Sequence, residues 1–451
     1  MPRTALRLTL FALLFASAAF AQQKTPAAKT PAATPALDPA RPIAITGGKL
    51  LTITHGTIDN GVLVIENGKI AAVGAASSVK VPANAQVVDA KGMTVYPGLI
   101  DSETHLGLTE ISAEKNTNDL VETSDEIMPH MHVADAFHAE SALIPVARYN
   151  GITNAIVAPD SKDTLPGQNS FIQLYGADAS AMLLIRDIAL PLNFTGKQRR
   201  NESFATSSYP STRMGMAAQL RQAFTDAQGY AAKWEEYNKK KAAAKPGDNP
   251  PSPPSRDLKL EALLPYLAGK KPVVVKAEEP NDVETAFALA QEFNLRVILN
   301  GLTHSQAIFD KIASWKVPVI VGSIYDEPKE WQRYDAVYRV PAELSKLGIK
   351  IAFASFEAHQ VRNLPYAAGF AVAFGLPYDE AMKALTLYPA QIWGVDDQLG
   401  SLDVGKSANV VVASGDPLDV KTVVQRVFIQ GRDVPMTNRQ TELRDHYSNR
   451  P

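Results

Sequence analysis

The segment from Tyr96 to His105, Y-P-G-L-I-D-S-E-T-H, places two side chains able to bind a metal at the end of an apolar run. Side chains alternate along a β-strand, so Glu103 and His105 are expected on the same face. Imidazole nitrogens and carboxylate oxygens both act as zinc ligands in proteins. Two such side chains on one face of a strand could reach the same metal ion.

The chain contains no cysteine, which limits the chemistry available to it. Disulfides, thiolate nucleophiles and cysteine metal ligands are excluded, so a bound metal must use His, Asp, Glu or a modified Lys. The sequence also lacks a G-x-S-x-G nucleophile motif and a glycine-rich phosphate loop ahead of a helix. Nucleophilic catalysis therefore has no support in the sequence.

Other histidines are weaker candidates than His105. His130 and His132 have an H-x-H spacing, but no apolar strand precedes them, which favours a solvated or loop-packed pair. His304 follows the strand pattern R-V-I-L-N-G and begins a helix. It is either a ligand at a strand end or a histidine beside a helix cap, and both interpretations stay open. His359 has less support, because it could approach the same region only from a loop.

The amino-acid composition limits the class of protein and the kinds of partner that can be expected. The 451 residues are 45% hydrophobic and 20% charged, as in an ordinary globular protein, and the formal net charge is −2. No basic tract suggests nucleic acid or an anionic membrane surface. The expected partner is a small-molecule substrate or ligand.

The N-terminal residues have the pattern of a secretory signal peptide. Arg3 and Arg7 precede a short apolar run, which ends in the small residues of Ala19–Ala21. The run is too short to span a bilayer comfortably. We expect residues 1–21 to be removed on export to the periplasm, leaving no membrane span. The Pro- and Ala-rich residues 22–41 are expected to form a tether.

The two ends of the folded region share one pattern. Short alternating apolar runs, separated by turn signals such as N-G and G-G, lie in residues 42–96 and again in 398–436. Such runs predict antiparallel strands joined by hairpins. We expect the two regions to form one small composite β-sandwich, followed by a C-terminal tail at 437–451.

The middle of the chain has a different period. Near-continuous apolar runs such as V-V-V-K-A alternate with amphipathic helical patterns over residues 97–397. That order is typical of parallel strands buried on both faces, in an eight-fold barrel or a doubly wound sheet. The charged and then Pro-rich residues 229–257 are expected to be a loop insertion.

Across residues 42–436 the chain resembles the amidohydrolase superfamily, specifically its imidazolonepropionase-like exported members. The resemblance is carried by I-E-N-G-K-I-A-A-V-G, V-Y-P-G-L-I-D, L-T-L-Y-P-A-Q-I-W-G-V and G-S-L-D-V-G-K-S-A-N-V-V-V in this order. It implies an α/β fold, a TIM-like (β/α)8 barrel inserted into a composite β-sandwich. It also implies hydrolysis of an amide, cyclic amide or related bond by a metal-activated water at the barrel mouth.

The chain departs from the pattern of this family at several positions. The first barrel strand should end in two histidines, and Glu103 stands at one of these positions. A later strand should end in a histidine, and Lys276 stands there; a protonated lysine has no lone pair for a metal. The last strand should end in an aspartate, but Ser355 and Phe356 occupy that place. Glu357 comes one residue late, on the opposite face of a continuing strand.

Two interpretations of the function remain open at this point. In the first, the protein hydrolyses a C–N bond at an atypical centre, with zinc on His105 and Glu103, and with Lys276 and His304 as further catalytic candidates. Relatives also have a bridging lysine, and near the corresponding segment of this chain the only lysine is Lys197. In the second, the protein is an inactive homologue that either binds a ligand or is the partner subunit of an active homologue. A homodimer, or a heteromer with such a homologue, is possible in this interpretation.

If the metal is lost, the barrel mouth has to compensate the charge of Glu103 in another way. A buried carboxylate without a cation is costly. We therefore expect the ammonium group of Lys276 within ~4 Å of a Glu103 oxygen, directly or through one water, with His105 alongside.

Overall fold

The computed structural model describes residues 37–194, 209–210, 212–247 and 249–448. The predicted signal peptide, most of the predicted tether and Lys197 lie outside these described residues. Within the described part of the chain, no helix combines the length and the apolar character that a membrane crossing requires.

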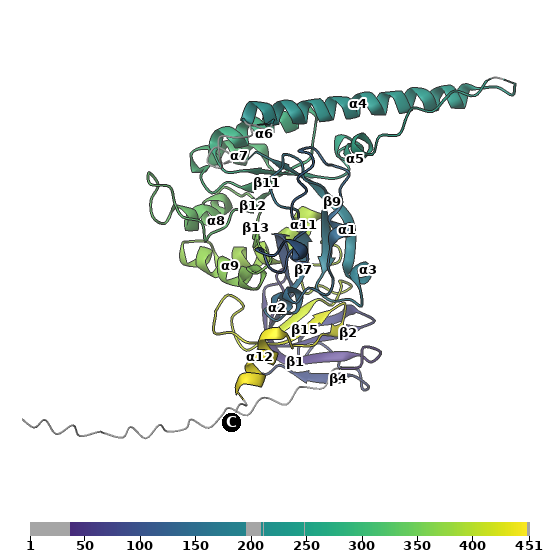
Figure 1. Cartoon of the computed structure of the whole chain (residues 1–451). Helices are drawn as coiled ribbons and strands as arrows, with labels where there is room; N and C mark the ends of the chain where they lie inside the picture. The colour runs from purple at the N-terminus through teal and green to yellow at the C-terminus, as the bar shows by residue number, and fades with distance from the viewer. Residues whose placement is uncertain (1–36, 195–208, 211, 248, 449–451) are drawn as a thin grey trace, which may run out of the picture. The chain divides into compact units, whose positions relative to one another are not determined.

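One eight-stranded sheet is built from both ends of the chain (Figure 1). Its strands run in the order β16-β15-β14-β5-β1-β2-β3, and β4 pairs with β1. The antiparallel pairing of β5 with β14 joins the N-terminal segment to the C-terminal one. The strands are β1 (Ile43–Leu51), β2 (Thr57–Glu66), β3 (Lys69–Ala75), β4 (Gln86–Asp89), β5 (Thr94–Pro97), β14 (Val410–Ala413), β15 (Val424–Ile429) and β16 (Arg432–Asp433).

Turn chemistry and side-chain alternation account for this composite sheet. Asn67 and Gly68 both have positive φ values, 51° and 77°, and form the tight turn between β2 and β3. Alternate residues such as Ile43, Ile45 and Leu63 are buried in one apolar cluster. The predicted tether ends earlier than expected, because Leu37 packs against this cluster and donates its N–H to Asp433 over 3.4 Å.

The second sheet has eight strands in the order β13-β12-β11-β10-β9-β8-β7-β6. Backbone bonds from Ser102 N–H to the Phe353 carbonyl (3.1 Å) and from Phe356 N–H to the Glu103 carbonyl (2.9 Å) link β6 to the end of β13. These bonds nearly close the sheet into a barrel. The strands are β6 (Leu99–Thr104), β7 (Ile152–Val157), β8 (Asn169–Gln173), β9 (Leu183–Asn193), β10 (Val273–Ala277), β11 (Val297–Gly301), β12 (Val319–Val321) and β13 (Ile351–Ala352).

The predicted fold class, a TIM-like barrel with a composite β-sandwich, is confirmed. One feature differs from a regular (β/α)8 barrel: β8 runs antiparallel to both β7 and β9, and no long crossover helix separates these strands. The barrel interior is apolar, with one side chain from most strands, including Ile100, Ile156, Phe171, Val274, Ile298, Ile320 and Ala352.

Helices follow most of the parallel strands, as the alternating pattern predicts. The longer ones are α2 (Leu143–Arg148), α4 (Arg213–Ala243), α5 (Leu258–Leu267), α6 (Pro280–Glu292), α7 (Phe309–Trp315), α8 (Ala336–Lys346), α9 (Leu364–Ala373), α10 (Tyr378–Leu385) and α11 (Leu387–Trp393). Short helices are α1 (Val133–Ala136) and α3 (Ala179–Met182). The predicted C-terminal tail contains a further helix, α12 (Arg439–Ser448).

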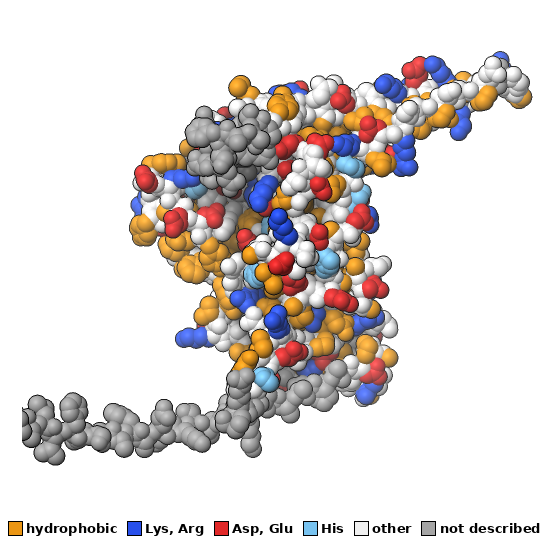
Figure 2. Space-filling view, in the orientation of Figure 1, with side chains coloured by type: hydrophobic (Ala, Val, Ile, Leu, Met, Phe, Trp, Pro, Cys, Tyr) orange, Lys and Arg blue, Asp and Glu red, His pale blue; other side chains and the backbone are white. Residues whose placement is uncertain are grey.

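The predicted loop insertion at 229–257 is wrong in its first half. Residues up to Ala243 continue α4, and only the following Pro-rich residues lack regular structure. Ion pairs one turn apart, Glu235–Lys239 and Glu236–Lys240, favour this helix although it buries no residue beyond Tyr230. Acidic and basic side chains accordingly mark the far end of α4 in Figure 2.

Candidate functional site

The barrel mouth is the end of the barrel formed by the C-terminal ends of its parallel strands and the loops that follow them. Three polar residues stand in register at the ends of neighbouring strands: Asn193 of β9 is opposite Lys276 of β10, and Lys276 is opposite Asn300 of β11. Directly opposed residues of parallel strands point to the same face. Asn193 and Asn300 are buried, at 2% and 0% exposure.

Glu103, at the end of β6, faces this row of polar residues. The regular pairing of β6 with β7 is interrupted between Asp101 and Thr104. Glu103 is 6% exposed and accepts a short hydrogen bond from the side-chain amide of Asn300. Burial raises the pKa of the Glu103 carboxyl group, although the charge of Lys276 acts in the opposite direction.

Lys276 reaches the same space, but it does not contact Glu103 directly. Among the residues that the structure describes, no ion pair joins the two, and the Lys276 Nζ lies 5.3 Å from the ring centroid of Phe356. The direct form of the expected contact is therefore wrong, and the contact through one water stays a prediction. Phe356 has a φ of 58°, a rare conformation for an aromatic residue, and this backbone turn aims its ring at the lysine.

His105 lies beside Glu103 with one ring nitrogen occupied. Its Nδ1 is 2.9 Å from the carbonyl oxygen of Ala158, which can only accept, so Nδ1 carries the proton. In the neutral imidazole the lone pair is then on Nε2. The charge of His105 lowers the pKa of Glu103, which agrees with the predicted placement of the two side chains together.

His304 stands after β11 at another part of the mouth. Its Nδ1 lies 2.9 Å from Oε1 of Gln332, in the loop that leads from β12 to α8. Burial raises the pKa of Asp326 in the same loop, and the charges of His304 and Lys276 oppose this shift. His304 and Lys276 therefore lie near enough to Asp326 for their charges to act on its carboxyl group.

Two more carboxyl groups lie at the mouth, the buried one of Asp101 and that of Glu278, a partly exposed residue. Asp101 accepts the N–H groups of Ser355 (3.0 Å) and Glu103 (3.2 Å), which fixes the end of β6 against the chain after β13. Burial raises the pKa of Asp101 to about 7. Burial also raises the pKa of Glu278, whose Oε2 accepts the N–H of Thr303 over 3.0 Å.

These side chains do not fit the metal centre that the resemblance implies. A zinc-type centre needs three or four unprotonated donors around one point. Glu103 and His105 are suitable donors, but the neighbouring strand ends supply the ammonium of Lys276 and two amides. In the described ranges, no group of three or more His, Cys, Asp or Glu side chains is placed to hold a metal ion. The roles predicted for Glu103, His105, Lys276 and His304 stay predictions.

The remaining sequence candidates lie apart from Lys276 and Glu103 or face outward. His132 has its Nδ1 2.6 Å from Asp187 of β9, so it is part of a polar pair. Nδ1 of His130 is buried without a hydrogen-bond partner. His359 and Glu357 are exposed.

Sequence reasoning missed several residues that surround Lys276. Asn193 and Asn300 each end an apolar run, in A-L-P-L-N and V-I-L-N, and this signal was available in the sequence. Asp326 and Glu278 gave no comparable signal, since each lies in a loop outside the apolar runs.

Comparison with known proteins supports the assignment of the fold to one superfamily. A family model described as "Amidohydrolase family" matches residues 337–434. The structure of an amidohydrolase from Thermotoga maritima MSB8 superposes with a TM-score of 0.77 at 28% sequence identity, over 88% of this chain and 100% of that chain. In its fold and in part of its sequence, the chain is similar to the amidohydrolase superfamily.

Curated relatives match over different lengths. Amidohydrolase tasK of Hapsidospora irregularis is 23% identical over 389 residues, which cover 82% of this chain and 39% of that protein. The chain thus corresponds to about two fifths of this relative's length. Imidazolonepropionase of Geobacillus kaustophilus is 52% identical over 56 residues, 11% of this chain and 13% of that enzyme.

Proposed function

We propose that the protein binds a small organic ligand at its barrel mouth and does not carry out metal-dependent hydrolysis. The observation that carries this proposal is the row Asn193, Lys276 and Asn300, in register at three strand ends. An ammonium group cannot ligate a metal and repels it. The two amides are neutral and bind zinc poorly compared with imidazole or carboxylate.

The same side chains are suited to holding a ligand. Lys276 supplies a positive charge for a carboxylate or carbonyl oxygen, and its Nζ lies 5.3 Å from the centroid of the Phe356 ring. The loop from β12 to α8 adds three exposed aromatic side chains near the mouth: Tyr325 (52% exposed), Trp331 (72%) and Tyr334 (76%). Exposed aromatic groups close to polar ones are typical of ligand sites.

The proposal predicts a ligand-dependent thermal shift that requires Lys276. Purified protein would be screened by differential scanning fluorimetry against N-acyl amino acids and cyclic amides. A ligand at a hundred times its Kd should raise the melting temperature by about 3–5 °C. Replacement of Lys276 by Met should abolish the shift, because it removes the positive charge that holds the ligand.

A matched control is Lys270→Met, a change at an exposed lysine just before β10. It should leave the shift unchanged. The contrary outcome is stoichiometric metal in the purified protein together with hydrolysis of the ligand. That result would favour a hydrolase acting on a C–N bond, with His105 and Glu103 as metal ligands.

The proposal places this binding in the periplasm, because residues 1–21 have the pattern of a signal peptide. N-terminal sequencing of protein from the native host should then find Gln22 at or near the start. Met1 on the mature protein would contradict this part of the proposal. An active homologue as a partner subunit also belongs to the proposal, and co-purification from the native host tests it.

A further inference from the structure

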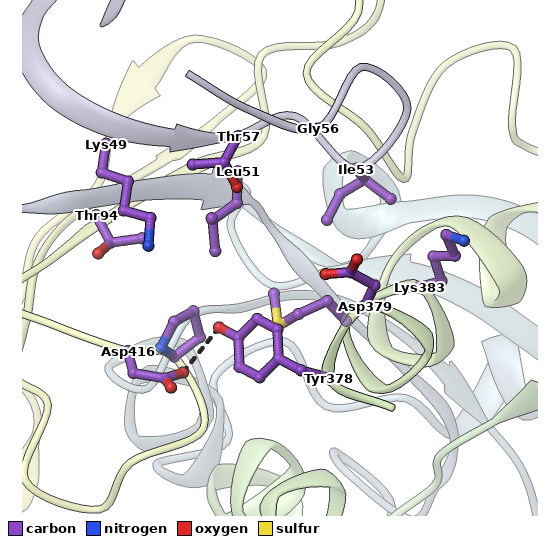
Figure 3. A pocket seen from close by; sticks show the side chains of 12 residues that line it. Lys49, Leu51, Ile53, Gly56, Thr57, Thr94, Tyr378, Asp379, Lys383 and Asp416 are labelled. Carbon is purple, nitrogen blue, oxygen red and sulfur yellow. Dashed lines mark hydrogen bonds between the residues drawn. The ribbon is translucent and has the colours of Figure 1, made fainter. Parts of the chain in front are cut away.

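A cavity of about 520 Å³ lies between the composite sheet and helix α10 (Figure 3). Its lining residues come from β1, β2 and β5 on one side, and from α10 and the loop after β14 on the other. None of these residues belongs to the barrel mouth. The volume is within the range of small-molecule sites, roughly 300–1,000 Å³, which often lie between domains.

The apolar part of the lining is held in a fixed position. Leu51, Ile53, Met382 and Pro417 line the cavity. Ile53 has a φ of 76°, which is unfavourable for a β-branched residue. Thr52 holds this turn, since its Oγ1 donates to the Gly56 carbonyl over 2.7 Å. The backbone strain is thus stabilised by the surrounding turn, and the Ile53 side chain points into the cavity (Figure 3).

Two further polar pairs in the cavity are already satisfied. The Tyr378 hydroxyl donates to Asp416 over 2.9 Å, and Lys383 pairs with Glu380 at the same distance of 2.9 Å. These groups shape the cavity, but their principal interactions are within the protein.

Two further charged side chains line the cavity, on opposite sides of it. Lys49 belongs to β1, and Asp379 lies in the first turn of α10. Within the described part of the chain, neither side chain has an ion pair or a side-chain hydrogen bond. Figure 3 shows Lys49 on one side of the cavity and Asp379 on the other, with Leu51 between them; Asp416 lies on the side of Lys49, and Lys383 lies beside Asp379. Among the described residues, the two lining charges without a partner, one positive and one negative, therefore stand on opposite sides of the cavity.

We propose that this cavity binds a small zwitterion with an apolar body, of about the size of a dipeptide. Lys49 receives the carboxylate of the ligand, and Asp379 receives its ammonium group. Leu51, Ile53 and Met382 contact the apolar side chains between these ends. The complementarity of charge fixes the orientation of the ligand.

Isothermal titration calorimetry with L-leucyl-L-leucine tests the proposal. N-acetylation removes the ammonium group of this probe, and amidation removes its carboxylate. Each capped form should bind roughly fivefold weaker, as expected for one partly exposed charge pair. Lys49→Gln should weaken the binding of the free dipeptide and of the acetylated dipeptide to a similar extent. It should not further weaken the binding of the amidated dipeptide, which lacks the carboxylate. Asp379→Asn should weaken the binding of the free dipeptide and of the amidated dipeptide. It should not further weaken the binding of the acetylated form, which lacks the ammonium group.

Control variants distinguish binding in this cavity from binding at the barrel mouth or elsewhere on the surface. Lys91→Gln changes an exposed lysine that does not line the cavity, and it should bind the dipeptide normally. Thr57→Trp places a large side chain at an exposed lining position and should abolish binding. Lys276→Met at the barrel mouth should have no effect. The proposal is overturned if the wild-type protein does not bind the dipeptide. It is also overturned if Lys49→Gln and Asp379→Asn each weaken the binding of all three ligand forms equally, or if Lys276→Met loses binding.

Discussion

Replacement of Asp101 by Asn should make the protein more stable at pH 8 than the wild type, by about 3–4 kcal/mol, with little difference near pH 4. The carboxyl group is fully buried, at 0% exposure, and its pKa rises from 3.8 to about 7 on folding. Between these two pH values the folded state holds a proton that the unfolded state has released. Wild-type stability should therefore fall as the pH rises from about 4 to 7.

The substitution keeps the interactions of Asp101 that position β6. Its Oδ1 accepts the N–H groups of Ser355 and Glu103, and an amide oxygen can accept the same two bonds. Asn cannot ionise, so the variant should lack this part of the pH dependence. Urea denaturation of both proteins between pH 4 and 8 measures the difference.

The control is Asp59→Asn, a change at an exposed carboxylate of β2, which should leave the pH profile as in the wild type. An Asp101→Asn variant less stable than the wild type at every pH would show that the ionised carboxylate is used in the folded protein.

The architecture was predictable because hydrophobic periodicity is a local property of the sequence. The N-G turn at Asn67–Gly68 and the alternating runs around it predicted hairpins, and the apolar run ending at Lys276 predicted a buried parallel strand. The helix beyond residue 229 is not evident from the sequence, since a charged segment that leads into Pro-rich residues is also typical of a loop. Their i,i+4 ion pairs favour a helix even without burial.

The site could be predicted only as far as strand ends could be located. Glu103, His105 and Lys276 were expected at the mouth on this basis; the structure places Glu103 and Lys276 at the ends of β6 and β10 and His105 directly after β6. The spacing of residues in the sequence could not show whether Lys276 contacts Glu103 directly. The Glu103 carboxylate instead accepts a hydrogen bond from the side-chain amide of Asn300. The turn at Phe356, with its positive φ, also has no signal in the sequence and places an aromatic ring beside the lysine.

If the ligand types alone prevent metal binding, then restoring them should create a zinc site. The double substitution Lys276→His with Asn300→His replaces an ammonium and an amide by two imidazoles at adjacent strand ends in register. Glu103 and His105 already stand beside them, and loss of the Asn300 amide frees the Glu103 oxygen that it now occupies. Four such donors are the usual number for zinc.

We expect the double variant to bind one zinc ion at least a thousandfold more tightly than the wild type, measured by competition with a chromophoric chelator. Binding should weaken at low pH, since the imidazoles must be neutral. The Asn300→His single variant is the matched control: it gains one ligand but keeps the Lys276 ammonium close to the Glu103 carboxylate, and so should bind zinc weakly. Equal affinity in the single and double variants would show that Lys276 does not exclude the metal, and the case for a mouth without metal chemistry would lose its main support.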